Sequence, residues 1–399
     1  MRHPRDVVIT GIGLVTSLGV GNDANWQALR AGVAPVIDLA VTPPFPVHPI
    51  APIDYDQQIP RKGDQRQMEP WQRIGVYAAG LALQDAGVAG NGELLGRTHM
   101  VTAAGGGERD IAVDEAIMSG MRQAQNKGAY LNERLANDLR PTLFLAQLSN
   151  LLAGNISIVH GVVGSSRTFM GEEPAGFDAL RIMAARIRAG QADLGLVGGS
   201  YSAHRPDMSI IYAFANGLIK DHYVPVWERA AQGGGMIMGG VGAFLVIEAR
   251  EHAEARNMRV LASLGAIAVD RGARSPGATA DRLSRLWRGV APAMTNETMG
   301  VLSGASGIAT ATTEEHAFLT TLARERAIAV RATGSRLGHS FEASAPANVA
   351  LAALALSRDD FLPAFGNDVI ETAAATPSHI LVTSVGHWRG EGLIMVGKA

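Results

Sequence analysis

Hydrophobic and polar positions along this chain follow two periods, one typical of helices and one typical of strands. From Phe169 to Gly190 the apolar residues fall on one helical face, Pro174 suits the first turn, and Gly190 is a natural stop. The apolar run 193–199 follows at once and predicts a strand. Further strands are predicted at 7–13, 98–104, 243–248, 260–268, 299–303, 379–384 and 393–397, and further helices at 25–30, 71–86, 108–137, 142–153, 281–290, 314–326 and 345–356. This alternation predicts an α/β protein with parallel strands covered by helices.

The same alternation of predicted strands and helices occurs twice along the chain. We therefore expect an internal duplication with one half at 1–248 and the other at 249–399, although direct identity between the halves is weak. The segment from Val41 to Pro60 is rich in proline and is predicted to be an irregular loop.

Composition narrows the classes of protein that this chain can represent. With 399 residues, 47% hydrophobic and 18% charged, it can bury a large core. A formal net charge of −2 without a dense Lys/Arg run argues against a nucleic-acid partner. No apolar run reaches the roughly 18–20 residues of a membrane span. The first 13 residues resemble an initial strand more than a signal peptide, so a cytoplasmic protein is expected.

Several common catalytic motifs are missing. The absence of cysteine excludes disulfides, thiolate metal sites and cysteine nucleophiles. The glycine triplets at 105–107 and 233–235 do not match a phosphate-binding loop, and the eleven histidines lack metal-ligand spacing. The serines Ser165, Ser166 and Ser200 do not occur in the G-x-S-x-G motif of hydrolases. We therefore expect no metal and no cofactor.

The start of the helix at 169–190 is unusually acidic. Glu172 and Glu173 immediately precede Pro174, in the positive field of the helix dipole. A reactive group would be activated in this field, but two carboxylates can equally be explained as favourable charges at a helix start. Because the two residues are adjacent, their side chains should diverge, which makes a facing carboxylate pair a poor interpretation.

Five stretches together resemble the β-ketoacyl-acyl-carrier-protein synthases, the condensing enzymes with the thiolase fold. They are the opening VVITGIGLVTSLGVG, residues 150–161, residues 187–193 with the following LGLVGGS, residues 235–243 with the following FLVIEAREHAEAR, and residues 384–392. The resemblance covers nearly the whole chain. It implies a thiolase-like α/β fold whose two duplicated halves give a five-layered αβαβα arrangement.

The residues at the family's catalytic positions are mostly replaced. Counting back from Gly198-Gly199 without a gap places the nucleophilic cysteine on Glu173. The first catalytic histidine falls on Ser306, whereas the second is retained as His339, with Gly334 where the family has a lysine. The resemblance thus implies a catalytic centre at Glu173, Ser306 and His339.

The closing loop of the family usually reads Gly-Phe-Gly-Gly and supplies a gate and an oxyanion-hole amide. Here Gly386 is followed by His387, Trp388 and Arg389, which the resemblance places at the substrate-binding position. We expect the Trp and Arg side chains to narrow or fill the space before the helix start, and Arg389 to form an ion pair with Glu173.

Three functions are compatible with these replacements. The first is a non-catalytic partner, similar to a chain length factor, of a cysteine-bearing synthase in fatty-acid elongation. The elbow stretch VGSSRTFMGEE also resembles the paired synthase-like proteins of very-long-chain fatty acid (lipid A) synthesis in α-proteobacteria. The second is an acyltransferase-family enzyme with altered chemistry, such as malonyl decarboxylation or acyl transfer through Glu173 and His339, for which His387 would need to enter the space of the missing histidine. The third is a binding module, a homo-oligomer with the thiolase fold that holds an acyl chain or a carrier protein without reaction.

The resemblance also implies the partners of this chain. They are an acyl carrier protein, an acyl chain, and a second subunit that gives either a homodimer or a heterodimer with a catalytic ketosynthase. If the protein is a binding module, the helix at 142–153 and the region 108–137 are expected to line an apolar tunnel.

Overall fold

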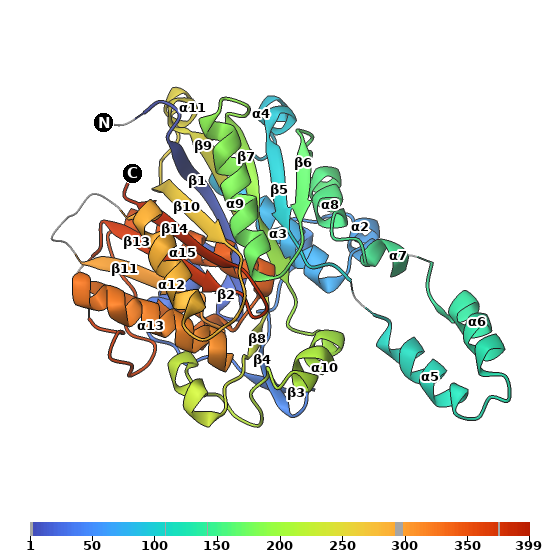
Figure 1. The fold of residues 1–399 in the computed structure, drawn as a ribbon. Helices are drawn as coiled ribbons and strands as arrows, with labels where there is room; N and C mark the ends of the chain where they lie inside the picture. Colours follow the sequence, from blue (N-terminus) through green and yellow to red (C-terminus); the bar gives the residue numbers. More distant parts are fainter. Residues whose placement is uncertain (1–2, 108, 142, 292–297, 374–375) are drawn as a thin grey trace.

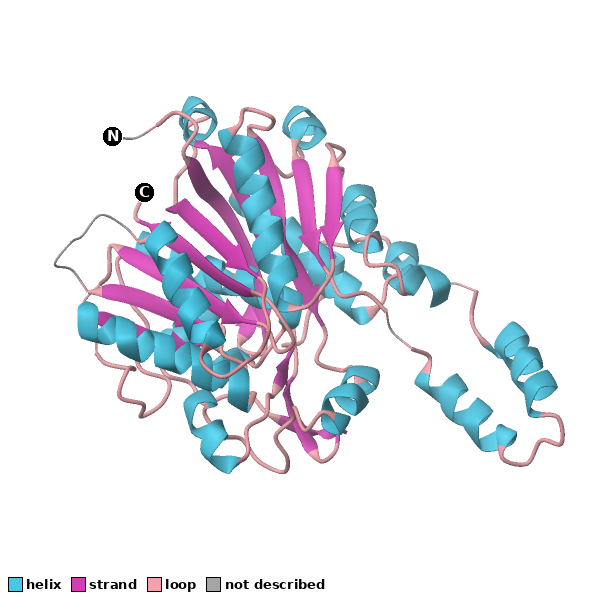
Figure 2. Ribbon diagram, in the orientation of Figure 1, coloured by secondary structure: helices cyan, strands magenta, loops and turns pink. Residues whose placement is uncertain are grey.

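The computed structural model describes residues 3–107, 109–141, 143–291, 298–373 and 376–399. Most of its strands join in one large, strongly twisted sheet (Figures 1 and 2). The strands of this sheet are β1 (Val7–Thr16), β2 (Gly19–Val20), β5 (His99–Ala103), β6 (Ser166–Phe169), β7 (Leu194–Tyr201), β9 (Val241–Ala249), β10 (Ala262–Asp270), β11 (Met299–Ser303), β12 (Ile328–Ala332), β13 (His379–Val385) and β14 (Glu391–Gly397).

The two halves of the sheet have the same topology. The order β6-β5-β7-β9-β1 in one half corresponds to β12-β11-β13-β14-β10 in the other. Each half contains two parallel and two antiparallel pairs of neighbouring strands, and β1 joins β10 through the register Val8↔Ser263. The sheet is therefore mixed, and the prediction of parallel strands holds for only some of its pairs. The exact division after residue 248 stays a prediction.

Helices form layers on both sides of the strands. Between the two halves of the sheet lie α9 (Glu173–Arg188) and α15 (Ser344–Ser357), which pack against each other. One outer layer contains α3 (Pro70–Asp85), and the other contains α12 (Ala278–Val290) and α13 (Ala309–Glu325). This is the five-layered arrangement implied by the resemblance. The helical spacing of α9 explains its central place, because its apolar face is fully buried and each such side chain contributes roughly 1.5–3 kcal/mol.

The remaining elements surround this core. They are the helices α1 (Asn22–Arg30), α2 (Lys62–Gln67), α4 (Gly92–Arg97), α5 (Ile111–Met121), α6 (Lys127–Asp138), α7 (Leu143–Ala146), α8 (Leu151–His160), α10 (Pro206–Phe214), α11 (Arg250–Ala255) and α14 (Gly334–Leu337), and the strands β3 (Asp38–Thr42), β4 (Phe45–His48) and β8 (Met238–Gly239). None of the helices in the described ranges is long and apolar enough to cross a membrane.

Several sequence predictions differ from the structure, and one of them is the single helical stretch predicted at 108–137, which contains the two helices α5 and α6. The predicted loop at 41–60 contains the end of β3 and all of β4. Strand β4 pairs with β3 and also with β8, and the second partner, almost 200 residues away, leaves no local signal. The single helix predicted at 142–153 is two helices, α7 and α8, and its first residue lies outside the described residues. Strand β12 was not predicted, and its five residues include Arg331, a charged residue that interrupts the apolar run but is buried in the structure.

The helices α5 and α6 form an arm that extends away from the body (Figure 1). Residue 108, at the start of the region 108–137, lies outside the described residues. Only Ile117 of these two helices is fully buried, whereas Met118 and Leu135 are exposed. The apolar side chains of this helical pair are therefore left largely uncovered within their own chain.

Candidate functional site

The site is built around the start of α9. Strand β6 leads through Gly171 to Glu172, which caps α9 with φ 63° and ψ −143°. A non-glycine residue in this region carries strain of about 1–3 kcal/mol, and such strain is typical of functional turns. The turn is fixed by close packing further along the helix, since a Cβ atom at Gly176 would lie 2.5 Å from the carbonyl oxygen of Glu342.

Glu173 forms a buried pair with His339. The distance from Glu173 Oε1 to His339 Nε2 is 2.8 Å, and both side chains are only 2% exposed. His339 is fixed by its backbone, because its N–H donates to the carbonyl oxygen of Ile237 and its carbonyl oxygen accepts from Gly239 N–H. The structure thus brings together two residues that are 166 positions apart and that both fall on catalytic positions of the resembled family.

The electrostatics of this pair favour an ionised carboxylate. Burial alone would raise the pKa of Glu173, but the hydrogen bond and charge of His339, together with the charge of His387, hold that pKa below its ordinary value of 4.5. Glu173 Oε2 is buried and has no hydrogen-bond partner among the described residues. One carboxylate oxygen of Glu173 therefore has a hydrogen-bond partner among the described residues, and the other oxygen has none.

Very little space remains beside the histidine. The void next to His339, on the side of Ser340, Ser344 and Asn348, is about 10 Å³, which is roughly the size needed for a single water molecule. An acyl group therefore cannot be accommodated on that side without movement of the protein.

The closing loop differs from the expectation for two of its three residues. Trp388 is 53% exposed and Arg389 is exposed as well, so the prediction that they fill the space before the helix start is wrong. The predicted ion pair between Arg389 and Glu173 is wrong too, because the described partner of Glu173 is His339. A short loop that is anchored at Gly386 and Gly390 turns its two large side chains toward solvent.

His387 is the residue of this loop that faces the interior. Its ring lies 5.7 Å from the ring of Tyr212 and 4.1 Å from that of Trp388. Burial lowers the pKa of His387, whereas the charge of Glu173 acts in the opposite direction. Both ring nitrogens are buried without a hydrogen-bond partner among the described residues.

A buried ion network holds the closing loop in place. The carboxylate of Glu391, which is 0% exposed, pairs with Arg274 and, at 2.8 Å, with Arg282. Arg274 also donates to the carbonyl oxygen of Gly386 at 2.7 Å. Gly386 must remain small, since a Cβ atom there would lie 2.2 Å from the carbonyl oxygen of Arg389 and 3.2 Å from Glu173 Oε2. The network therefore positions the loop against the carboxylate.

Ser306 does not join the pair. It lies in the loop after β11, where its hydroxyl accepts from Ile308 N–H at 3.2 Å and its carbonyl oxygen accepts from Arg229 at 2.9 Å. No hydrogen bond between Ser306 and Glu173 or His339 occurs within the described ranges of the chain. The lysine that the resembled family has at the position of Gly334 would not fit here, because a Cβ atom would lie 2.8 Å from the carbonyl oxygen of Ala305.

Sequence reasoning missed Arg229, Tyr212 and Glu342. Arg229 is fully buried, and burial lowers its pKa to about 10. Tyr212 donates to Glu172 Oε1 at 3.3 Å, and Glu342 Oε1 accepts from Glu172 N–H at 3.0 Å. Tyr212 and Glu342 come from α10 and the turn after His339, and no sequence motif marks their approach to Glu172.

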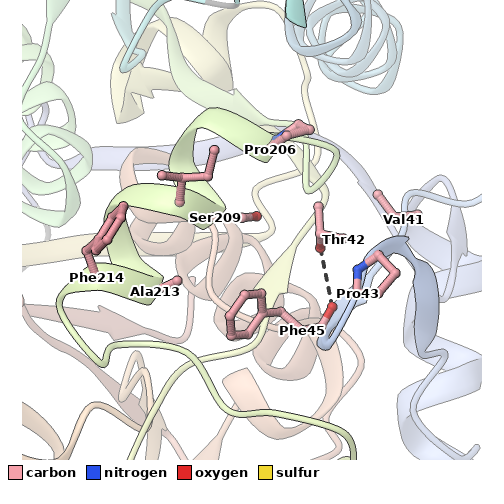
Figure 3. A pocket seen from close by; sticks show the side chains of 9 residues that line it. Val41, Thr42, Pro43, Phe45, Pro206, Ser209, Ala213 and Phe214 are labelled. Carbon is pink, nitrogen blue, oxygen red and sulfur yellow. Dashed lines mark hydrogen bonds between the residues drawn. The ribbon is translucent and has the colours of Figure 1, made fainter. Parts of the chain in front are cut away.

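Two further cavities border α10. One of about 240 Å³ borders Glu172, Glu342, Trp71, Tyr201, Met208 and Phe341. The other, of about 470 Å³, is an apolar groove between α10 and the β3–β4 turn (Figure 3). Its walls include Pro43, Phe45, Pro206 and Phe214, and none of the predicted site residues borders it. No group of three or more His, Asp or Glu side chains in the described ranges is placed to hold a metal ion.

Comparison with known proteins agrees with this architecture. Residues 4–253 match the family model described as "Beta-ketoacyl synthase, N-terminal domain". The 3-oxoacyl-[acyl-carrier-protein] synthase 2 of Vibrio cholerae is 26% identical over 270 residues, which cover 65% of this chain and 62% of that protein. The tetracenomycin polyketide synthase ketoacyl synthase beta subunit of Streptomyces glaucescens is 28% identical over 268 residues, 64% of this chain and 61% of that protein. The chain thus spans about three-fifths of the length of these curated relatives.

A solved structure supports the fold independently. The ishigamide ketosynthase/chain length factor superposes with a TM-score of 0.81 at 20% identity, covering 99% of both chains. Identity at this level shows the thiolase-like fold alone. The family match over residues 4–253, together with the duplicated strand order and the position of the α9 elbow, establishes that the chain belongs to the β-ketoacyl synthase family.

Proposed function

We propose that this protein is a non-catalytic, chain-length-factor-like partner of a cysteine-bearing β-ketoacyl synthase in acyl chain elongation. The observation that carries the proposal is the buried pair of Glu173 and His339 at the start of α9. In the family this helix start bears the cysteine that accepts the acyl chain. Here a carboxylate replaces the thiol and engages the one retained histidine.

The chemistry of the pair argues against condensation by this chain alone. An acyl group on a carboxylate would be an anhydride, which hydrolyses far more readily than a thioester. The ionised Glu173 would also repel the carboxylate of a malonyl group. Ser306 forms its described hydrogen bonds with Ile308 and Arg229, and it leaves the enolate without the second histidine of the family.

An exposed sheet edge supports pairing with a second subunit. Strand β6 lies at the end of the sheet, with β5 as its neighbour. Three large apolar side chains close to this edge, Ile158, Val163 and Met170, are 67%, 70% and 63% exposed. An unprotected edge strand with exposed apolar side chains is a template for strand pairing. We therefore propose a dimer through β6, with the arm α5–α6 reaching the partner.

The relatives suggest the other partners. The Vibrio cholerae relative is by its name a synthase that acts on acyl-carrier-protein substrates. We infer that this protein meets an acyl carrier protein through its partner synthase, in the cytoplasm, and that it helps to wall the partner's acyl tunnel. The elbow stretch supports very-long-chain fatty acid synthesis as the pathway.

One observation favours a second function. Glu173 Oε2 and both ring nitrogens of His387 are buried without hydrogen-bond partners among the described residues. Such a pair of groups can hold a polar molecule, so decarboxylation or acyl transfer through Glu173, His339 and His387 is the alternative.

The test compares products with and without a cysteine-bearing synthase from the same genome. Mass spectrometry would follow products from malonyl- and acyl-carrier substrates. We expect neither carbon dioxide nor product from this protein alone, and longer products when both proteins are present. Carbon dioxide release by this protein alone that disappears in His339→Ala would establish the alternative.

Val163→Asp is expected to weaken the proposed dimer at least tenfold, because it places a charge beside the edge strand β6. Val163 is 70% exposed, so the melting temperature of the monomer should hardly change. Sedimentation velocity measures the effect. Val369→Asp is the matched control, because Val369 is 81% exposed and lies far from β6 in the sequence. An unchanged dimer in Val163→Asp would argue against this interface.

A further inference from the structure

The cavity beside the start of α9 combines apolar walls with two carboxyl groups, those of Glu172 and Glu342. Its walls are largely aromatic and thioether side chains, among them Trp71, Tyr201, Met208 and Phe341. Glu172 borders the same space and is separate from the buried pair of Glu173 and His339, because Glu173 does not line it. A cavity of this kind provides space for a mostly apolar ligand and one fixed position for a polar contact.

Glu172 is held in this position from both ends. Its N–H donates to Glu342 Oε1 at 3.0 Å, and its Oε1 accepts from the Tyr212 hydroxyl at 3.3 Å. The Glu342 carboxyl in turn fits against Gly105, where a Cβ atom would lie 2.9 Å from Glu342 Oε1. The backbone of Glu172 has φ 63°, a strained conformation for a residue other than glycine, and this conformation is typical of functional sites.

The other polar side chains of the cavity have their own partners. Ser200 donates to the carbonyl oxygen of Trp71 at 2.8 Å. Arg205 forms an ion pair with Asp207 at 2.7 Å. For Glu172, no hydrogen bond to Oε2 is described within the ranges that the structure covers. The Glu342 carboxyl, which also borders the cavity, accepts from Glu172 N–H through its Oε1. Glu172 Oε2 is therefore a polar atom of the cavity that a ligand can engage.

The charge state of Glu172 suits a neutral oxygen on the ligand. Burial, followed by the charges of Glu173 and Glu342, raises the pKa of Glu172 to about 7. Near neutral pH the protonated acid can donate to a keto oxygen, and the carboxylate can accept from a hydroxyl. The neighbouring carboxyl groups of Glu173 and Glu342 disfavour an anionic ligand group, whereas the charge of Arg389 acts on Glu172 in the opposite direction.

We propose that Glu172 makes this cavity selective for an acyl chain that carries a hydroxyl or keto oxygen over a chain that is plain hydrocarbon. The inference rests on the proposed function, which brings an acyl chain to the elbow. A plain hydrocarbon would cover Glu172 without replacing its hydrogen bonds to water, which is costly. An oxygenated chain replaces them, so Glu172 determines specificity and takes no part in a reaction.

The test uses two neutral probes, the pantetheine thioesters of decanoic acid and of 3-hydroxydecanoic acid. Trp71 borders the cavity, so tryptophan fluorescence together with calorimetry can report binding to the full-length protein. The hydroxylated probe is expected to bind about tenfold more tightly, as one hydrogen bond to a carboxyl group would give. In Glu172→Leu this preference should disappear, and the decanoyl probe should bind at least as well as to the wild type.

Glu172→Gln is the matched control, because its amide retains a donor and an acceptor at the same place. It should keep the preference for the hydroxylated probe within about threefold of the wild type. It also keeps the test informative if Glu172→Leu fails to fold, which thermal melting would reveal. Equal affinities of the two probes for the wild type, no binding of either probe, or an unchanged preference in folded Glu172→Leu would overturn the proposal. Because binding requires no synthase partner, these results are separate from the product assay that tests the proposed function.

Discussion

Glu173→Ala is expected to lower the free energy of unfolding by about 3 kcal/mol or more, because it leaves His339 buried without its partner. Both side chains are 2% exposed, so water cannot replace the lost contact without local opening. His339→Ala should cost a similar amount for the converse reason. Urea denaturation of the two variants and of the double variant measures the effects. The double variant should lose less than the sum of the single changes, because it leaves no unpaired member.

Two controls make this prediction specific. Glu115→Ala removes an exposed glutamate from α5 and should change the free energy of unfolding by less than about 0.5 kcal/mol. The fold lowers the pKa of Glu173, so its ionised form contributes stability that is complete above the ordinary value of 4.5 and is lost as the pH falls through the lower pKa of the folded state. The stability difference between the wild type and Glu173→Gln should therefore shrink in acid. A constant difference down to the lowest pH, or strictly additive single variants, would contradict an ionic pair.

Glu391→Ala is expected to have an equally large effect, because it removes the shared carboxylate of two arginines. Arg274 and Arg282 are 16% and 9% exposed at their side chains, and both would lose their ionic partner. We expect a loss of about 3–5 kcal/mol in the free energy of unfolding. The closing loop should also loosen, which would appear as faster hydrogen exchange at Gly386 N–H, now bonded to the carbonyl oxygen of Gly390.

The comparison for this change is Glu254→Ala. Glu254 pairs with Arg250 at 3.8 Å and is 59% exposed, so the same substitution should cost less than about 1 kcal/mol. If Glu254→Ala and Glu391→Ala lowered the free energy of unfolding by similar amounts, burial would not be the reason that the Glu391 network stabilises the protein.

The sequence predicts most of the fold because its signals are local. The 3.6-residue period of α9 and the continuous apolar run of β7 lie within single elements, and both appear close to their expected bounds. The pairing of β3–β4 with β8 and the antiparallel joining of β1 to β10 depend on residues far apart in the chain. Neither leaves a periodic signal in the strand concerned.

The candidate site is predictable only where a family motif marks it. Family motifs locate Glu173 and His339, and the structure brings them to 2.8 Å. The same comparison cannot orient Trp388 and Arg389, because side-chain direction depends on how Gly386 and Gly390 close the loop. It also cannot identify Glu172 as the carboxyl at the cavity, since its environment comes from Tyr212 and Glu342 on distant segments.

We propose that this chain carries no acyl group and serves a partner that does. The deciding experiment is intact-protein mass spectrometry, after the complex with a cysteine-bearing synthase is exposed to an acyl-carrier donor and no malonyl substrate. We expect an acyl mass on the partner's cysteine and an unmodified mass for this protein. An acyl mass on this protein that is lost in Glu173→Ala would instead establish Glu173 as an acceptor and rule out the non-catalytic role.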